Sequence, residues 1–419
     1  MKKNILIIGS GGREHAIGWK LMQSKNIGQL YFAPGNGGTS ALGKNIPIAS
    51  DNVEELLRFA KTAHIDLTIV GPEVPLSLGI VNKFTKENLP IFGPTKEAAR
   101  LETSKAWAAT FLKRHNLPHP VSEIFDDPES ALAYSKKFNS NVVIKADGLC
   151  QGKGVFVCNN MGDAQQAIQS LMVEKIFGST GGRIVIQEKL IGKEISVMVF
   201  SDGTRVAPII AASDYKRLKN NNQGPNTGSM GSLAPSSNAS IQQLKTIYQL
   251  LGRIVECMRQ EGIIYRGVLY GGMMIASGKP YILEFNCRFG DPETEAQLPL
   301  LTSDLLSIIE ACIDGSLSPR LVSFSHQTCV CVILAAPGYP GIYKKNIPIH
   351  GLEKLHNQSV IVFHAGTSKE KSKTMTTGGR VLGITACDQT KEKARTKVYT
   401  LIGKHIRFTG MQYRTDIGL

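Results

Sequence analysis

The chain has 419 residues, 42% of them hydrophobic, which exceeds what one compact core usually holds, so we expect two or three domains. Its formal net charge of +14 favours anionic partners, but lysines and arginines are spread along the sequence and the densest clusters, 216–219 and 369–373, are short. These features favour phosphorylated small molecules over nucleic acid, and no apolar run approaches the length needed to span a membrane.

The first hundred residues alternate short β-branched runs with helical patterns. In chain order the segments are "NILIIG", "REHAIGWKLMQ", "LYFAPG", "NVEELLRFAKTA", "DLTIVGPE", "PLSLGIVNKFTKE" and "PIFGPT". Alternation of this kind predicts a parallel sheet covered by helices. A further helix is predicted over residues 101–116, and Pro118 and Pro120 end its pattern.

Beyond residue 120 the pattern changes to one that is typical of antiparallel hairpins. A strand over 141–146 and a glycine loop are followed by a hairpin over 194–210, which turns at Asp202-Gly203. Residues 213–236 are expected to form a long polar loop, and such a loop inside a compact domain is usually functional. The remaining expected elements are a helix over 240–260, strands over 267–276 and 279–285, and an apolar strand from 328 that opens a smaller C-terminal domain.

Cysteine usage and the N-terminus both favour a cytoplasmic protein. The eight cysteines form no CxxC pair, and Cys329 and Cys331 alternate with valines, which is typical of core thiols in a reducing compartment. The start "MKKNILIIGSGG" resembles a signal peptide, but glycines and the charged Arg13-Glu14 pair interrupt its apolar run after four residues.

Three glycine loops follow strands of the expected parallel sheet, at 9–14, 34–38 and 71–73. The first lacks the third glycine of a dinucleotide fingerprint, because Glu14 occupies that position. Its backbone N–H groups at a helix N-terminus can still bind an anion, and Arg13 adds positive charge. Ligands of open parallel sheets bind beyond the carboxyl ends of the strands, so these loops favour a phosphate-bearing substrate. A tight turn with Arg13 in solvent is the structural alternative.

The segment "VIKADGLCQGKGV" places Lys145 inside an apolar strand, where an unpaired ammonium group is unfavourable. Three glycines and Lys153 follow in a loop that can fold over phosphates, although the spacing is not that of a P-loop. A hairpin with an edge lysine is the alternative. Further on, the segment "VIQEKLIGKEIS" ends a strand with polar side chains suited to an adenine edge and ribose hydroxyls, namely Gln187, Glu188 and Glu194.

The stretch "EFNCRFGDPETE" continues an apolar strand with charged residues. Strand geometry directs Glu284, Asn286 and Arg288 to one face and apolar residues to the other. A carboxylate and an amide oxygen two positions apart suit Mg²⁺, and the arginine can hold a phosphate or carboxylate beside it. A solvated face of salt bridges fits poorly, because the alternate residues are apolar.

These segments together resemble the nucleotide site of ATP-grasp ligases. The similarity extends to the phosphoribosylamine–glycine ligase (glycinamide ribonucleotide synthetase) family, whose motifs occur in order from residue 11 to residue 382. They are "GGREHA", "PGN", "IDLTIVGPE", "IFGPT", "SKAW", "VIKADGL", "GKGV", "GPNTG", "EFNCRFGDPE", "FHAGT" and "GGRVL". "NCRFGDPE" is the most specific of them. The chain departs from the family pattern at Gln187, at Ala212-Ser213, at Ser229 and at Glu295, where an amide is common.

The resemblance implies an α/β fold of three parts: a Rossmann-like pre-ATP-grasp domain over 1–103, an ATP-grasp unit over 104–325 with a lid at about 122–192, and a small α+β domain over 326–419. The implied reaction joins glycine to phosphoribosylamine through glycyl phosphate, with ATP and with Mg²⁺ or Mn²⁺, in purine biosynthesis. The implied partners are small molecules, without nucleic acid or membrane, and the implied assembly is a monomer or weak dimer.

The resemblance also implies roles for individual residues. The implied ATP-binding residues are Lys105, Lys145, Gly148, Gly152, Lys153, Gly154, Gln187, Glu188, Lys189 and Glu194, and the metal ligands are Glu284 and Asn286. The implied substrate-binding residues are Gly11, Gly12, Arg13, Glu14, Asn36, Glu73, Asp214 and Arg288, and the catalytic set is Arg288, Asp214 and Asp291. Two other interpretations stay open: an ATP-grasp carboxylase that depends on bicarbonate, and a non-enzymatic nucleotide- or RNA-binding protein.

Overall fold

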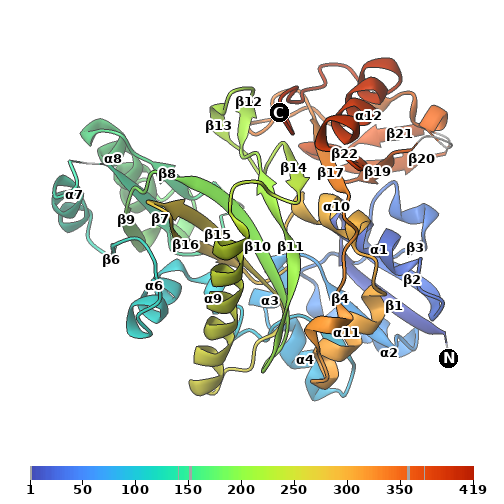
Figure 1. The fold of residues 1–419 in the computed structure, drawn as a ribbon, viewed down its shortest axis with the longest axis horizontal. Helices are drawn as coiled ribbons and strands as arrows, with labels where there is room; N and C mark the ends of the chain where they lie inside the picture. The colour runs from blue at the N-terminus through green and yellow to red at the C-terminus, as the bar shows by residue number, and fades with distance from the viewer. Residues whose placement is uncertain (1, 140, 151–152, 356–358, 372) are drawn as a thin grey trace.

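The N-terminal part of the chain is a five-stranded parallel sheet covered by helices, as the alternating patterns predict (Figure 1). The computed structural model describes residues 2–139, 141–150, 153–355, 359–371 and 373–419. The strand order is β3-β2-β1-β4-β5, and the central strands are buried on both faces. The strands are β1 Lys3–Gly9, β2 Ile27–Pro34, β3 Lys44–Asn45, β4 Leu67–Val70 and β5 Ile91–Phe92, and the helices are α1 Gly12–Leu21, α2 Val53–Thr62, α3 Glu73–Ser77 and α4 Ile80–Lys86.

The single helix predicted over 101–116 is two helices, α5 (Arg100–Thr103) and α6 (Lys105–Arg114). Ser104 between them has an extended backbone, and its hydroxyl accepts a hydrogen bond from the Trp107 N–H at 3.1 Å. The break could not be recognised from the sequence, because the helical spacing of apolar residues continues almost unchanged across the serine N-cap. The break makes Lys105 the first residue of α6.

A small lobe of four antiparallel strands follows, in the order β6-β9-β7-β8, and projects to the left in Figure 1. Two helices pack on it, and the lobe has its own apolar core. Its strands are β6 Ser122–Phe125, β7 Val142–Ala146, β8 Val155–Val157 and β9 Ile184–Glu188, and its helices are α7 Pro128–Lys136 and α8 Met161–Ile168.

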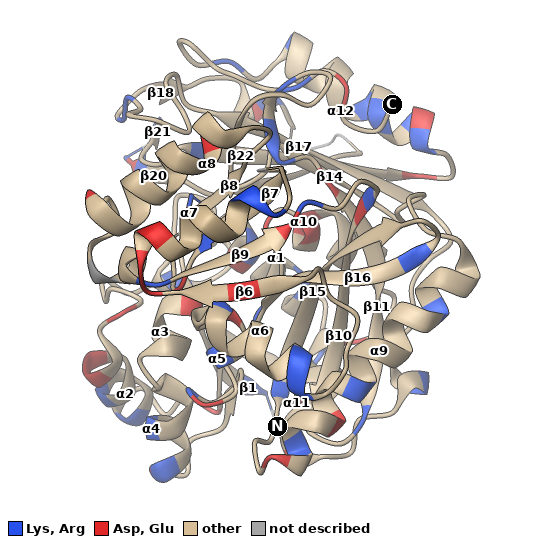
Figure 2. Cartoon of the chain, turned by 90° about the vertical axis from the view of Figure 1, so that its left-hand side faces the viewer, with Lys and Arg blue, Asp and Glu red and all other residues tan. Residues whose placement is uncertain are grey.

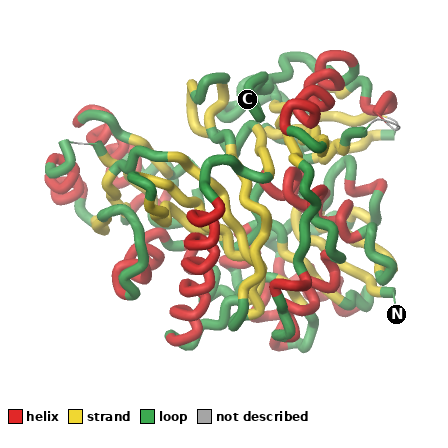
Figure 3. Tube along the Cα trace, in the orientation of Figure 1, coloured by secondary structure: helices red, strands yellow, loops and turns green. Residues whose placement is uncertain are grey.

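The centre of the molecule is an eight-stranded sheet in the order β16-β15-β10-β11-β14-β17-β22-β19. The predicted turn at Asp202-Gly203 and a second turn at Ser277-Gly278 join its hairpins, and helix α9 (Ile241–Gln260) lies along one face (Figure 3). The strands are β10 Lys193–Asp202, β11 Val206–Asp214, β14 Gly231–Ala234, β15 Arg266–Ala276, β16 Lys279–Asn286, β17 Thr328–Ala335, β19 Ile361–His364 and β22 Arg380–Asp388.

One expectation needs correction here. Residues 213–236 are not simply a loop, because β12 (Arg217–Lys219) and β13 (Gln223–Asn226) form a two-stranded ribbon before β14 joins the central sheet. The apolar strand predicted from 328 is β17, which pairs with β14 and so extends the central sheet. Short polar strands paired across a turn leave too little periodicity for the sequence to reveal them.

The remaining C-terminal elements cover the end of this sheet. Helix α12 packs its apolar face on β17 and β22. The other elements are α10 Glu293–Gln297, α11 Leu305–Asp314, α12 Lys391–Lys404 and the small sheet β18 Pro348–Ile349, β21 Lys373–Thr376 and β20 Thr367–Glu370. In the part of the chain that the structure describes, no helix is both long and apolar enough to cross a bilayer. Lysines and arginines are scattered over the elements in the view of Figure 2, in line with their spread along the sequence.

The C-terminal tail fixes the β12–β13 ribbon through a buried arginine. The Arg414 side chain donates to both carboxylate oxygens of Asp416 at 2.7 Å, and its Nη1 donates to the Arg217 carbonyl oxygen at 3.2 Å. The guanidinium also lies over the Tyr215 ring, 5.1 Å from its centroid. Only 2% of Arg414 is exposed, so these bonds lie largely out of water.

Replacing Arg414 with alanine is expected to lower the free energy of unfolding by about 1.5–3 kcal/mol, the scale of a hydrogen bond to a charged group, because Asp416 then loses its arginine partner. Urea denaturation monitored by circular dichroism measures this change. The matched control is Arg407→Ala, which removes an exposed arginine and should change stability by less than about 0.5 kcal/mol. Equal effects of the two variants would show that Arg414 does not hold the β12–β13 ribbon in place.

Candidate active site

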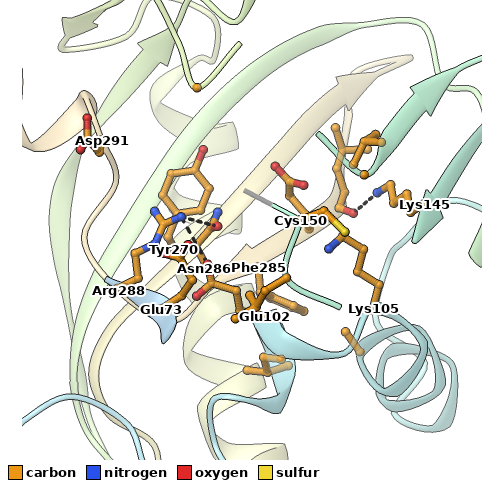
Figure 4. A pocket seen from close by; sticks show the side chains of 18 of the residues that line it. Glu73, Glu102, Lys105, Lys145, Cys150, Tyr270, Phe285, Asn286, Arg288 and Asp291 are labelled. Carbon is orange, nitrogen blue, oxygen red and sulfur yellow. Dashed lines mark hydrogen bonds and ion pairs between the residues drawn. The ribbon is translucent and has the colours of Figure 1, made fainter. Parts of the chain in front are cut away.

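A cleft of about 380 Å³ lies where the N-terminal sheet, the small lobe and the central sheet meet (Figure 4). It contains most of the charged residues that the sequence singled out. Those lining it are Arg13, Glu73, Lys105, Lys145, Gly154, Gln187, Asp214, Glu284, Asn286, Arg288 and Asp291. Arg380 also lines the cleft, so residues up to 367 positions apart in the sequence, Arg13 and Arg380, form one site.

One wall of the cleft carries lysines. Lys145 on β7 is 5% exposed and donates from Nζ to the Leu283 carbonyl oxygen at 2.7 Å. That carbonyl is free because β16 has a bulge: Glu284 pairs with Gly272 and Ile282 with Met273, which leaves Leu283 without a partner. Burial lowers the pKa of Lys145 to about 8, although the negative charge of Glu284 opposes this.

Lys105 and Lys216 complete this wall. Lys105 lies at the start of α6 and donates from Nζ to the Gly148 carbonyl oxygen at 3.0 Å. Lys216, next to the β12–β13 ribbon, has its Nζ 3.6 Å from Glu284 Oε1 and 3.4 Å from Glu194 Oε2. In the sequence, Lys216 appears only as part of a short basic cluster. Its acidic partners Glu194 and Glu284 lie on other strands, so the local sequence does not reveal them.

Glu284 and Asn286 on β16 both face the cleft, as strand alternation predicts. Burial opposes ionisation of Glu284, but the positive charges of Lys216 and Lys145 outweigh it and lower the pKa of Glu284 to about 2. Asn286 Oδ1 accepts a hydrogen bond from Arg288 Nη2 at 3.1 Å. The Glu284 carboxylate is therefore ionised at neutral pH and available to a cation.

This donor set fits a hard divalent cation that keeps part of its water. Among the described residues no three His, Cys, Asp or Glu side chains are grouped to hold a metal ion. One carboxylate and one amide oxygen match Mg²⁺, which is usually bound through one or two carboxylates together with phosphates and water. We therefore expect phosphates and water to complete the ligands of the cation, beside Glu284 and Asn286.

Arg288 is held between two carboxylates on the opposite wall. Its Nε lies 3.4 Å from Glu73 Oε2, and its Nη2 lies 3.3 Å from Glu102 Oε1. Glu102 also accepts a hydrogen bond from the Cys287 N–H at 2.7 Å, and burial raises the pKa of Glu102. Sequence reasoning missed Glu102, because nothing near it in the chain marks a partner 185 residues away.

Asp214 and Asp291 lie farther along the cleft, in different electrostatic surroundings. Burial and the charge of Glu293 raise the pKa of Asp214 to about 7, and its Oδ1 has no hydrogen bond within the described residues. Asp291 instead pairs with Arg380, whose Nη2 lies 3.0 Å from Asp291 Oδ1. Arg380 belongs to the "GGRVL" motif, which marked the family but gave no role to this residue.

The structure excludes one of the two interpretations of the first glycine turn. Arg13 is only 6% exposed, so the alternative that places it in solvent is wrong. Its Nη1 donates to the Phe289 carbonyl oxygen at 3.1 Å. The Gly11 N–H donates to Glu14 Oε2 at 2.6 Å, so one backbone donor of the turn is bonded to the chain's own carboxylate. A Cβ on Gly71 would lie 2.1 Å from Glu14 Oε1, and this close packing explains the glycine there.

Several predicted residues do not line the main cleft. Asn36 supports neighbouring loops, donating from Nδ2 to Ser10 and His364 carbonyl oxygens at 2.9 and 2.8 Å. Glu188 accepts from the Val121 N–H, and Lys153 is exposed. The other residues outside the main cleft are Gly11, Gly12, Glu14, Gly148, Lys189 and Glu194, of which Glu194 lines a small adjoining pocket. Gly152 lies outside the described residues.

A Rossmann-like parallel sheet, an antiparallel lobe with a buried lysine and a central sheet with Glu284 and Asn286 surround a single cleft, and together they define an ATP-grasp ligase. Three family models match in succession: the phosphoribosylglycinamide synthetase N domain over 3–102, the ATP-grasp (A) domain over 103–294 and the C domain over 329–419. The chain belongs to the phosphoribosylglycinamide synthetase family.

Known proteins resemble the chain over its whole length. It is 44% identical to the phosphoribosylamine–glycine ligase of Caldanaerobacter subterraneus subsp. tengcongensis, over 99% of both chains. It is 43% identical to the trifunctional purine biosynthetic protein adenosine-3 of Gallus gallus, with all of this chain matching 42% of that protein. The crystal structure of phosphoribosylamine–glycine ligase from Thermotoga maritima has a TM-score of 0.87 at 35% identity, covering 99% of this chain and 100% of that one.

Proposed function

We propose that this protein joins glycine to 5-phosphoribosylamine with ATP, giving glycinamide ribonucleotide, ADP and phosphate in de novo purine biosynthesis. The observation that carries the proposal is the similarity over 99% of both chains to a phosphoribosylamine–glycine ligase. The cleft supports it with chemistry suited to phosphoryl transfer, since lysines face an ionised carboxylate across a partly buried space.

The proposed reaction has two steps. A glycine carboxylate oxygen attacks the γ-phosphorus of ATP, and the bond to the ADP oxygen breaks to leave glycyl phosphate. The phosphoribosylamine nitrogen then attacks the glycyl carbonyl carbon, phosphate leaves, and the nitrogen loses a proton. Phosphoryl transfer depends on positioning and charge neutralisation, so no protein nucleophile is required.

Individual residues have proposed roles in these steps. Lys105 and Lys145 hold ATP phosphates, and Gln187 with Gly154 borders the nucleotide. Arg288 holds the carboxylate or the transferring phosphate group, with Glu73 and Glu102 fixing its orientation. With a pKa of about 7, Asp214 is suited to accept the proton from the attacking amine near neutral pH.

Glu284 and Asn286 would hold Mg²⁺ or Mn²⁺. When bound there, the cation neutralises phosphate charge.

The four-stranded lobe corresponds to the proposed lid at about 122–192, and the proposed domains are residues 1–103, 104–325 and 326–419. A cytoplasmic location and a monomer or weak dimer stay predictions.

Omitting each substrate in turn tests the function. ADP release is expected only when ATP, glycine and phosphoribosylamine generated in the assay are all present, because the second step removes the acyl phosphate that the first step forms. Coupled detection of ADP measures the rate, and the control replaces glycine with bicarbonate. Release that follows bicarbonate and ignores glycine would overturn the proposal in favour of a carboxylase.

A further inference from the structure

Two carboxyl groups touch each other at the edge of the cleft. Glu295, on helix α10, is 1% exposed, and its side chain is in hydrogen-bonding contact with that of Asp291. The Oε2 atom of Glu295 is buried, and no donor reaches it among the described residues. Two ionised carboxylates have no hydrogen to place between them, so this contact requires a proton.

Positive charge near the pair is concentrated on one member. Arg380 Nη2 lies 3.0 Å from Asp291 Oδ1, and Arg380 Nη1 donates to the Asp291 carbonyl oxygen at 2.8 Å. The other nearby cation, Arg13, is already paired through Nε with Glu14 Oε1 at 2.5 Å. Asp291 thus has a direct ionic partner, and Glu295 has none in the part of the chain that the structure describes.

Among the described residues, Arg380 and Arg13 are the cations that act on Glu295. Helix α1 contributes Gly12, where a Cβ would lie 2.3 Å from Glu295 Oε1, together with Arg13. Strand β22 contributes Arg380 and strand β17 contributes Cys331, whereas Asp214 at the end of β11 lies near Glu293. Burial raises the pKa of Glu295, and the charge of Asp291 raises it further.

We infer that Glu295 and Asp291 share one proton, and that Glu295 is a positioning residue which donates its carboxyl O–H to Asp291 and so holds that carboxylate at the wall of the cleft. Asp291 lines the cleft and Glu295 does not, so Glu295 acts through Asp291 rather than on substrate. The proton on Glu295 does not depend on the proposed reaction. Only the expected effect of Glu295 on activity rests on the proposed function.

The first experiment locates the proton without measuring activity. The infrared difference spectrum of the wild type minus Glu295→Gln at neutral pH should contain the carbonyl stretch of a protonated carboxyl group, because the contributions of other carboxyl groups, such as Asp214 with its pKa of about 7, cancel. The corresponding difference for the control Glu310→Gln, at a half-exposed glutamate paired with Lys3, should lack it. A Glu295→Gln difference spectrum without that stretch would overturn the inference.

Thermal unfolding gives a second readout. A carboxyl group whose pKa is raised in the folded state stabilises the fold fully below its ordinary value of 4.5, and this contribution is lost as pH rises towards the folded value. The Tm of the wild type minus that of Glu295→Gln should therefore fall as pH rises from 4.5 towards neutrality. A difference that does not change with pH would contradict a proton on Glu295.

Activity tests the positioning role. Glu295→Gln keeps a hydrogen-bond donor towards Asp291 and should retain kcat/KM for glycine within about twofold, whereas Glu295→Ala should lose at least about tenfold, the scale of one hydrogen bond to a charged group. The KM for ATP should change little in either variant. Equal losses in both variants would overturn the role. Absence of glycine-dependent turnover in the wild type would refute the proposed function and leave the infrared and thermal tests valid.

Discussion

Glu284→Gln should lower ADP release at least about a hundredfold, the scale of removing one electrostatic stabiliser worth roughly 3 kcal/mol in a water-poor site. Glutamine keeps the size of the side chain but removes the negative charge that faces three lysines and would hold the cation. Binding of ATP without metal should change much less, because the lysines remain. Rates of ADP release across a Mg²⁺ titration measure the effect.

The control for this substitution is Glu256→Gln on α9, where an exposed ion pair with Arg259 is lost. Exposed pairs contribute little to stability, and Glu256 lies outside the cleft, so this variant should turn over like the wild type. If Glu284→Gln kept the wild-type rate and the wild-type Mg²⁺ dependence, the metal site would have to lie elsewhere.

Lys145→Ala is the second change with a large expected effect. The variant should fold, because Lys145 lines the cleft and is not part of the apolar core of the lobe, yet it should lose about 10²–10³-fold in turnover with the loss of one preorganised charge. Steady-state ADP release and circular dichroism measure the two expectations. The matched control is Lys113→Ala, an exposed lysine on α6. Near-normal activity of Lys145→Ala would remove this residue from the site.

The pH dependence of ATP binding provides a further check on Lys145. Its pKa in the free protein is lowered to about 8, so the ammonium charge is present below that pH and is lost as pH rises through it. The KM for ATP should accordingly increase above pH 8 in the wild type and depend less on pH in Lys145→Ala. The same pH dependence in both proteins would assign the titration to another group.

Features set by local periodicity were predictable from the sequence. Alternating strand and helix patterns gave the parallel N-terminal sheet, and turns such as Asp202-Gly203 gave the hairpins. The face shared by Glu284 and Asn286 followed from the two-residue repeat of a strand. The break at Ser104 and the β12–β13 ribbon were missed, because a cap and a very short strand pair disturb that periodicity too little to be recognised.

The sequence by itself determined which residues could carry the chemistry and, through ordered motifs, the family to which the chain belongs. Only the tertiary structure decided their partners: Arg288 with Glu102, Lys216 with Glu284, Arg380 with Asp291, and Glu14 with the turn that an anion was expected to occupy. The physical reason is that charge state and orientation depend on burial and on the sum of nearby charges, and folding brings those charges together from segments that local sequence patterns do not connect.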